Sequence, residues 1–548
     1  MSAQSCELFK PSQEKFALSK RATTLFVKLT NLFLLLPLLG AFSLIQSYGE
    51  KVESALYEKQ DLWLPVFVRM EDQLVNQAGD YKEIAESRSG KPRSQNRMEV
   101  ISILREKAEL SWIKLSGKIG VLVEKNAVRN PQKFWIVNGF ACEAKIEAIE
   151  ELVREDEISY VYLDRFASSD VISSPMSEQK MTRMRKAYDT WRESSPLSKR
   201  RKKIPWNVRE IGAERAWKDE NATGLGVTVA VIDSGILPTP ALVRALAKKT
   251  NEELNGKDDD GNGLIDDLFG YDFRSNTGYI LDDSRTSSHG SACAGIIAGQ
   301  ASSSGWQTGL APDCRLLLLK GGFDLRCMEY LLIEEAEVLS MSYMIVGRDM
   351  GQTRGLIRNA FEHLSLGGVL ALGGAGNYGP ESRRAMPWGK QIGLPKDIPC
   401  VLAVSGVDRA RTQLPFSSEG PCFWDGVSFF SDYPKAKPLA KPDLCAFPTG
   451  YPVWNVTGSH RLRLGWKETS VSEGASLVTG PAGNSFSGPH AAGVAALVFS
   501  VNPTINSWEV GAILQNTAQD LGPDGRDDKF GAGLIDALAA VRSARERN

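Results

Sequence analysis

In the first third of the chain, the hydrophobic positions of some short segments follow the period of a strand, and those of others follow the period of a helix. Leu64, Val66 and Val68 alternate with other residues, as in a strand of residues 62–70. Apolar positions recur at helical spacing in residues 97–112 and 143–153, and residues 134–141 and 158–163 read as further strands. This alternation predicts a small α+β domain whose helices cover one face of a sheet.

From Ile204 to the C-terminus, short aliphatic runs alternate with longer amphipathic stretches. Uninterrupted apolar runs of this kind are typical of strands buried on both faces of a parallel sheet. The expected strands are 227–232, 315–319, 368–372 and 401–407, and 356–366 is an expected helix. We therefore predict that residues 204–548 form an α/β domain, a doubly wound and mostly parallel sheet with helices on both faces.

The first 47 residues have the layout of an export signal. Basic side chains precede an uncharged, Leu-rich run at residues 29–45, and residues 41–43 offer a small-x-small cleavage pattern. The run is at the short end of what spans a bilayer, so a cleaved signal peptide and an uncleaved membrane anchor both fit. We expect the rest of the chain to be exported, either secreted or held at the cell envelope, with membrane contact only if this segment stays uncleaved.

Residues 166–203 separate the two predicted domains. They are rich in Ser, and the part from 171 to 203 holds ten basic and three acidic side chains, ending in five consecutive basic residues. This composition predicts an exposed basic linker. It contains either a protease-accessible processing junction or only a solvated spacer.

Composition excludes several classes of function. The 65 Lys and Arg residues balance 66 Asp and Glu residues, so the chain has no field to attract nucleic acid. Eight Cys residues among 548, without a CxxC pair, indicate neither a disulfide scaffold nor a zinc ribbon. A base that works near neutral pH must come from only four histidines, which are His289, His363, His460 and His490.

Three sequence islands carry candidate chemistry. Asp233 ends an apolar strand, His289 begins a run of small residues, and Ser485 precedes a second such run. Alone, each residue also fits a structural role, as a turn cap, a packed histidine or a helix N-cap. Their order along the chain is Asp, His, Ser, which is the order in subtilisin and differs from that in chymotrypsin and in the α/β-hydrolases.

With these islands, residues 204–545 resemble the subtilisin-like serine proteases, or subtilases. Further segments follow in the family's order, namely 309–312, 338–342, 374–377, 416–418, 441–443 and 530–535. The resemblance implies that Ser485 attacks the peptide carbonyl, that His289 carries its proton, and that Asp233 orients the imidazole. Asn377 and the Ser485 N–H would stabilise the oxyanion. We expect a serine endopeptidase that acts on protein or peptide substrates through an acyl-enzyme, without an organic cofactor.

The resemblance also assigns substrate contacts. An extended substrate would pair with the strand at Ser342 and Tyr343, and a small-residue segment would form one wall of the pocket for the residue before the cut. That wall consists of Gly374, Ala375 and Gly376. The family usually has Leu-Gly where this chain has Tyr343-Met344, which leaves the shape of the pocket open. Asn484 replaces the usual Thr and could help to hold the oxyanion.

Residues 58–165 resemble the inhibitory propeptide of subtilases. In the family this domain packs its sheet on the protease, and its C-terminus occupies the active site until it is cut. The resemblance implies an inactive, self-processed precursor with its own propeptide as an intramolecular inhibitor. Cleavage near Asp170 and cleavage at the basic run are both open.

An acidic segment, residues 255–267, places oxygen ligands at alternating positions beside a turn glycine. The pattern is that of the start of a calcium loop, although position 12 would be Phe269 and not the Glu of an EF-hand. The expected ligands of a structural Ca²⁺ are Asp258, Asp260, Asn262 and Asp266. A hydrophilic turn without metal is the alternative.

Two other functions compete with that of a protease. A catalytically inactive member would keep the fold as a binding or regulatory module, but the complete triad, Asn377 and the propeptide argue against it. An esterase or lipase would place its residues in the order Ser, Asp, His and would use a nucleophile elbow, which this sequence lacks.

Overall fold

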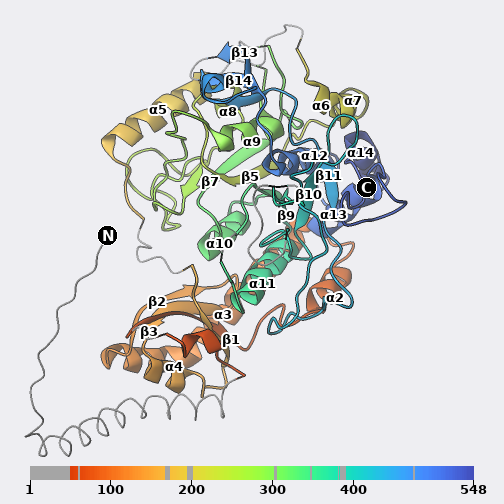
Figure 1. Cartoon of the computed structure of the whole chain (residues 1–548). Helices are drawn as coiled ribbons and strands as arrows, with labels where there is room; N and C mark the ends of the chain where they lie inside the picture. Colours follow the sequence, from red (N-terminus) through yellow and green to blue (C-terminus); the bar gives the residue numbers. More distant parts are fainter. Residues whose placement is uncertain are drawn as a thin grey trace, which may run out of the picture.

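The computed structural model describes residues 50–59, 62–166, 173–193, 202–301, 305–345, 348–380, 382, 391–472 and 475–547. They form an N-terminal domain and a larger C-terminal domain, with helices α10 and α11 at the junction (Figure 1). The expected signal segment, the candidate cleavage position Asp170 and most of the basic run lie outside these residues. Within them, no helix is long and apolar enough to cross a membrane.

The N-terminal domain is built on an antiparallel sheet of four strands in the order β2-β3-β1-β4. Its elements are η1 (Ser54–Leu56), β1 (Leu64–Met70), α2 (Asp80–Ser87), α3 (Arg93–Glu124), β2 (Val128–Phe134), β3 (Gly139–Ala144), α4 (Ile146–Leu152) and β4 (Ile158–Leu163). Val52 and Leu56 are buried in this domain's core, so the domain begins upstream of the predicted boundary at residue 58.

The prediction of one strand over residues 134–141 is wrong. Phe134 ends β2 and Gly139 begins β3, so the apolar residues between them form the turn of a hairpin. A Cβ on Gly139 would lie 2.5 Å from the carbonyl oxygen of Val68, which explains the glycine at this point. Periodicity alone could not show the turn, because Ile136 and Val137 are buried.

The two faces of the N-terminal sheet have different partners. In β1, Val66 and Val68 point to the domain's own helices, while Phe67 points to the C-terminal domain. In β4, Val161 and Tyr162 divide in the same way, as the two-residue period of a strand requires. The sheet is therefore an interface as well as a core element.

The C-terminal domain contains a parallel sheet of seven strands in the order β11-β10-β9-β8-β5-β7-β6. The strands are β5 (Thr228–Asp233), β6 (Gly270–Asp272), β7 (Arg315–Lys320), β8 (Val338–Met341), β9 (Leu370–Gly374), β10 (Leu402–Gly406) and β11 (Leu444–Ala446). A second, antiparallel sheet consists of β12 (Val453–Asn455), β13 (Lys467–Ser472) and β14 (Ala475–Thr479). The predicted α/β fold is confirmed.

Helices cover both faces of the parallel sheet, and a separate apolar core lies between the sheet and the helices of each face. Those on one side are α6 (Trp206–Glu210), α7 (Ala213–Glu220), α8 (Pro240–Val243), α9 (His289–Ala298), α12 (Ser487–Val501), α13 (Ser507–Asn516) and α14 (Ala537–Arg545), with η2 (Ser459–Leu462) and η3 (Asn484–Phe486) in the connecting segments. On the other side lie α10 (Leu325–Ile333) and α11 (Thr353–Leu366). A Cβ on Gly488 would lie 2.6 Å from the Gly374 nitrogen, so the small residues of α12 allow its close approach to β9.

The expectation of an exposed linker is wrong for residues 178–193, which form helix α5 (Glu178–Glu193). Met181, Met184 and Ala187 are buried in the core of the C-terminal domain. The Trp191 ring packs at a tilt against Phe269, with ring centroids 6.0 Å apart. The basic composition concealed these apolar positions, whose spacing of three residues is helical.

Candidate active site

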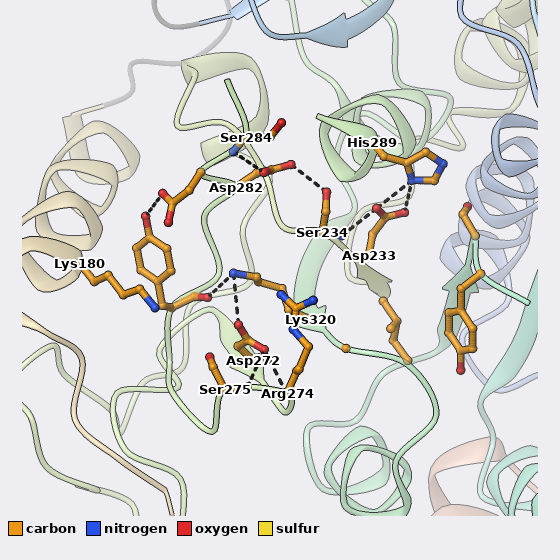
Figure 2. A pocket seen from close by; sticks show the side chains of 16 residues that line it. Lys180, Asp233, Ser234, Asp272, Arg274, Ser275, Asp282, Ser284, His289 and Lys320 are labelled. Carbon is orange, nitrogen blue, oxygen red and sulfur yellow. Dashed lines mark hydrogen bonds and ion pairs between the residues drawn. The ribbon is translucent and has the colours of Figure 1, made fainter. Parts of the chain in front are cut away.

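The carboxyl ends of the central strands border a pocket of about 530 Å³ (Figure 2). Asp233 ends β5, Lys320 ends β7, and Ser342 directly follows β8. The strand order reverses about β5, and parallel sheets place their ligand crevices at such a point. The sequence signal at Asp233 therefore led to the correct edge of the sheet.

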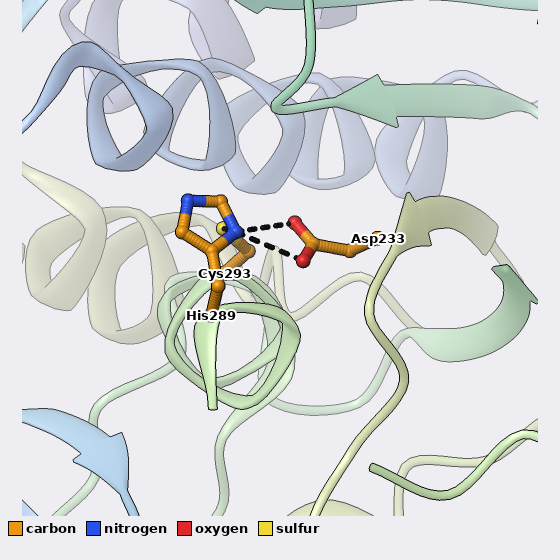
Figure 3. A group of neighbouring side chains, drawn as sticks. All are labelled: Asp233, His289 and Cys293. Atoms are coloured by element: carbon orange, nitrogen blue, oxygen red, sulfur yellow. Dashed lines mark hydrogen bonds and ion pairs between the residues drawn. The ribbon is translucent and has the colours of Figure 1, made fainter. Parts of the chain in front are cut away.

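Asp233 and His289 form a close pair (Figure 3). Nδ1 of His289, the first residue of α9, lies 2.8 and 2.9 Å from the two carboxylate oxygens of Asp233. Because Nδ1 donates to this carboxylate, Nε2 is left as the acceptor for a substrate-side proton. The Ser234 N–H donates to the same carboxylate over 2.7 Å and holds it in place.

The pair stabilises the imidazolium that forms once the His289 ring takes up a proton. Burial alone would raise the pKa of Asp233, but His289 and the hydrogen bonds outweigh it and keep this pKa below its usual value. Cys293 and the Asp233 carboxylate beside the ring raise the pKa of His289. His363 and His490 are buried, with pKa values lowered to about 4, and cannot replace His289 as the base.

Ser485 lies in η3, just before α12. Its Oγ is 3.5 Å from the carbonyl oxygen of Ser342, and within the described part of the chain it has no direct hydrogen bond to His289. Cys293 joins the two segments, with its Sγ 3.8 Å from His289 Nδ1 and 3.5 Å from the Ser485 carbonyl oxygen. Catalytic hydrogen bonds are often long before substrate binds, so this geometry is compatible with a nucleophile and its base.

Asn377 is oriented as an oxyanion donor requires. Its Oδ1 accepts the N–H of Asn484 over 2.7 Å, which leaves its NH₂ group for a second partner. Asn484 is buried, and its own amide donates to the Gly376 carbonyl and the Ser417 hydroxyl. The expectation that the Asn484 side chain could assist the oxyanion is wrong, because these bonds occupy its NH₂ group.

A smaller cavity of about 110 Å³ lies beside Ser485. Its lining contains most of the predicted substrate contacts: Ser342, Tyr343, Gly374 and Gly376, together with Met344, Asn377, Tyr378 and Ser485. Ala375 is the exception, since it is fully buried and packs against Ile392 and Ala403. Gly376 has a φ of +119°, and a Cβ there would lie 2.7 Å from the Ser418 hydroxyl, so this wall requires glycine.

The predicted calcium ligands come together only in part. Asp258 and Asp260 approach Glu252, with one carboxylate oxygen of each within 4.8 Å of the others. Asn262 Oδ1 accepts the Leu264 N–H, and Asp266 Oδ1 accepts two backbone N–H groups. The Oδ2 of Asp266 is buried and has no hydrogen-bond partner among the described residues. Sequence reasoning missed Glu252, which precedes the acidic run and belongs to no motif.

This acidic cluster carries excess negative charge. Burial and the neighbouring aspartates raise the pKa of Glu252 to about 7. Lys249 is the nearby counter-charge, and its Nζ lies 2.6 Å from Asp260 and 2.9 Å from both Asp267 and Glu334. The orphaned oxygen of Asp266 and the raised pKa of Glu252 are what a site suited to a hard cation would show.

Comparison with known proteins shows the family. The subtilase family model (Peptidase_S8) matches residues 224–533, more than half of the chain. Over 479 residues the chain is 25% identical to Bacillopeptidase F of Bacillus subtilis, covering 84% of this chain but only 29% of that protein. It is 26% identical over 474 residues to Serine protease AprX and 25% identical over 450 residues to Subtilisin E, both of Bacillus subtilis, with 89% of each covered. These alignments include 82% and 80% of this chain. The chain therefore belongs to the subtilase family of serine peptidases.

Proposed function

We propose that this subtilase is an exported endopeptidase in which Asp233, His289 and Ser485 act as the catalytic triad. Ser485 Oγ attacks the peptide carbonyl while His289 Nε2 takes its proton and then passes it to the leaving amine. Water then attacks the acyl carbonyl while His289 takes its proton, and this proton passes to Ser485 Oγ as the acyl group is released. The observation that carries the proposal is the 2.8 Å contact between His289 and Asp233 in the lining of the large pocket, which shares Ser342 and Tyr343 with the small cavity that Ser485 lines.

The developing oxyanion would be held by the Asn377 NH₂ group and the Ser485 N–H. Asn484 supports this arrangement, because its backbone N–H fixes the Asn377 amide and its side chain ties the nucleophile segment to Gly376. An extended substrate would lie along Ser342 and Tyr343, with one side chain in the small cavity.

We also propose that the N-terminal domain is the inhibitory propeptide of this precursor. The Trp135 and Ile136 N–H groups both donate to Glu329 Oε1 of α10, over 2.5 and 3.0 Å. Arg97 of α3 donates to the carbonyls of Ala336 and Gly367 and so reaches the end of α11. These contacts support a docked inhibitor domain that must be cut from the peptidase before substrate can enter.

A pair of proteins tests the proposed activity. The full chain and its Ser485→Ala variant are expressed side by side and followed for self-cleavage and for hydrolysis of unfolded casein. We expect the wild type to process itself and to digest casein, and the variant to stay full length and inert. A folded wild type that remains uncut and inactive would favour the non-catalytic binding module instead.

We propose in addition that the acidic loop binds a structural Ca²⁺. Glu252, Asp258 and Asp260 supply the converging carboxylates, and Asp266 is adjacent, with its backbone N–H 3.0 Å from Glu252 Oε1. The bound cation would offset the charge of the cluster and so stabilise the loop. Calcium alone should raise the melting temperature of the Ser485→Ala protein, and Asp258→Asn should reduce that rise more than Asp219→Asn does. Equal melting curves with calcium and with chelator would exclude the site.

A further inference from the structure

The larger pocket beside Asp233 and His289 has an outer wall that comes from helix α5. Lys180 of α5 lies in the pocket lining (Figure 2), beside the ring of Tyr279. Its Nζ lies 4.9 Å from the centroid of that ring. A segment that precedes the matched family domain thus contributes to the surroundings of the candidate triad.

The carboxylates of the pocket other than Asp233 are held by neighbouring groups. Asp272 lies 3.3 Å from Lys320 Nζ. Asp282 accepts hydrogen bonds from the hydroxyls of Ser234 and Ser288 over 2.8 and 2.7 Å. Asp283 accepts from the hydroxyl of Tyr279 over 2.6 Å and pairs with Arg183. Asp272 and Asp283 are thus each paired with a cation, whereas Asp282 keeps its negative charge and is held by two hydroxyls.

Two cationic side chains remain without a carboxylate. Arg274 is exposed and rises from the loop after β6 into the pocket (Figure 2), and its guanidinium has no ion pair within the described part of the chain. Lys180 has only the contact with Tyr279 in those same residues. Burial, and then the positive charges of Lys180 and Arg274, lower the pKa of Lys320 although it is paired with Asp272. Lys180, Arg274 and Lys320 are thus close enough for their charges to influence one another.

The position of this pocket relative to a substrate follows from strand geometry. Ser342 and Tyr343 line both the large pocket and the small cavity next to Ser485. Successive side chains of an extended peptide point to opposite sides. If the residue before the cut occupies the small cavity, the residue before that one faces the large pocket.

We propose that the large pocket is a specificity subsite that accepts an acidic side chain, Asp or Glu, at the second substrate residue before the cut. Arg274 and Lys180 would bind its carboxylate, and Lys320 would stay paired with Asp272. The proposal rests on the proposed endopeptidase activity. It makes α5 a part of the mature enzyme, as the burial of Met184 also indicates.

The test uses peptide substrates that differ only at that position, with Glu, Gln or Lys, and measures kcat/KM for each. For the wild type we expect a value about tenfold higher with Glu than with Gln, and a lower value still with Lys. In Arg274→Gln and Lys180→Gln the ratio of Glu to Gln should fall toward one while the value for Gln changes little. Arg274→Glu should reverse the preference. Lys186→Gln serves as the control, because Lys186 is an exposed cation of the same helix outside the pocket lining.

Several outcomes would overturn the subsite. It is excluded if the wild type cleaves the Glu and Gln peptides equally, if the variants slow all three peptides alike, or if Lys186→Gln changes the ratio as much as Lys180→Gln does. An effect at Arg274 with none at Lys180 would remove α5 from the subsite. Failure of the wild type to cleave any of these peptides, or casein, would instead contradict the endopeptidase activity.

Discussion

In the segment around Ser485, one residue, Asn484, fixes the orientation of the side chain of another, Asn377. Asn377 has an amide with two possible orientations, and the N–H of Asn484 selects the one that leaves the NH₂ group free. Replacement by Leu keeps the approximate size of the side chain and removes this donor. We therefore expect Asn377→Leu to fold, to keep its KM, and to lose about 100- to 1,000-fold in kcat, as is typical when one oxyanion donor is removed.

Steady-state kinetics on one peptide substrate, together with a melting curve, would check this prediction. Asn455→Leu is a poor control because Asn455 is buried, whereas the exposed Asn251→Leu makes the same chemical change away from the site. An Asn377→Leu enzyme with unchanged kcat would remove this residue from the mechanism.

Lys396 is a buried lysine whose charge lacks compensation. Its Nζ has no hydrogen-bond partner within the residues the structure describes, and it lies 4.8 Å from the ring centroid of Tyr343. Burial lowers its pKa to about 7 from the 10.5 of the unfolded chain. Since the folded protein disfavours the charged form, the destabilisation is complete below pH 7 and disappears as the pH rises toward 10.5.

Lys396→Met should therefore stabilise the Ser485→Ala protein by a few kcal/mol at most, and by more at pH 6 than at pH 9. Urea unfolding at both values of pH would measure the gain. Lys437→Met makes the same change at an exposed position and should alter stability by less than about 0.5 kcal/mol. Equal gains at pH 6 and pH 9 would contradict the assignment of an uncompensated charge.

Among the elements, helix α5 is the one whose role differs most from the expectation. Met184 is fully buried in the C-terminal core, although it stands in a strongly basic segment. We expect Met184→Ala to destabilise the C-terminal domain by about 2–5 kcal/mol through loss of buried apolar contacts. Met98→Ala is a matched control, because Met98 is 67% exposed and should have little effect on stability. Similar melting temperatures for the two variants would show that α5 is only a spacer.

The elements that could be predicted from sequence are those in which local pattern and tertiary environment agree. The strand that ends at Asp233 is aliphatic and buried on both faces, so its sequence indicated both its type and its place in the sheet. Three features were not predicted from the sequence: the hairpin turn before Gly139, helix α5 and the position of Glu252 beside Asp258 and Asp260. In each of them, long-range contacts outweigh the local pattern, since the turn is buried against α10 and the Glu252 carboxylate is placed by folding alone.

At the scale of the whole molecule, His363 of α11 joins the two domains. Its Nε2 accepts the N–H of Val75 over 2.9 Å, and its Nδ1 donates to the carbonyl of Ile136 over 2.6 Å. Both partners belong to the N-terminal domain, so the docked state requires a neutral imidazole. Burial is the main cause that lowers the pKa of His363 to about 4, with smaller contributions from Arg69 and Lys107.

The sign of the pH dependence follows from this shift. A histidine with a depressed pKa stabilises docking fully above its free pKa of 6.5, and this stabilisation is lost as the pH falls toward 4. Between pH 6.5 and 4.5 the loss is at most two pKa units, or about 100-fold in the docking equilibrium. Glu329 acts in the opposite direction, because burial raises the pKa of its carboxyl to about 8. The contribution of His363 to docking is therefore obtained by comparing the parent protein with a variant that lacks this histidine, both measured at the same pH.

Hydrogen exchange in the Ser485→Ala background can measure this difference, since the Val75 amide is protected only while the domains are docked on His363. Between pH 7 and pH 4.5, protection at Val75 should fall by up to about 100-fold more in the parent protein than in a His363→Gln variant, in which no ring takes up a proton. Glu329, Arg69 and Lys107 are present in both proteins, so their effects cancel in the comparison. Protection at Ile232, deep in the parallel sheet, should stay equal in the two proteins and serves as the internal reference. The same pH dependence with and without His363 would show that the domain interface does not respond to protonation of this residue.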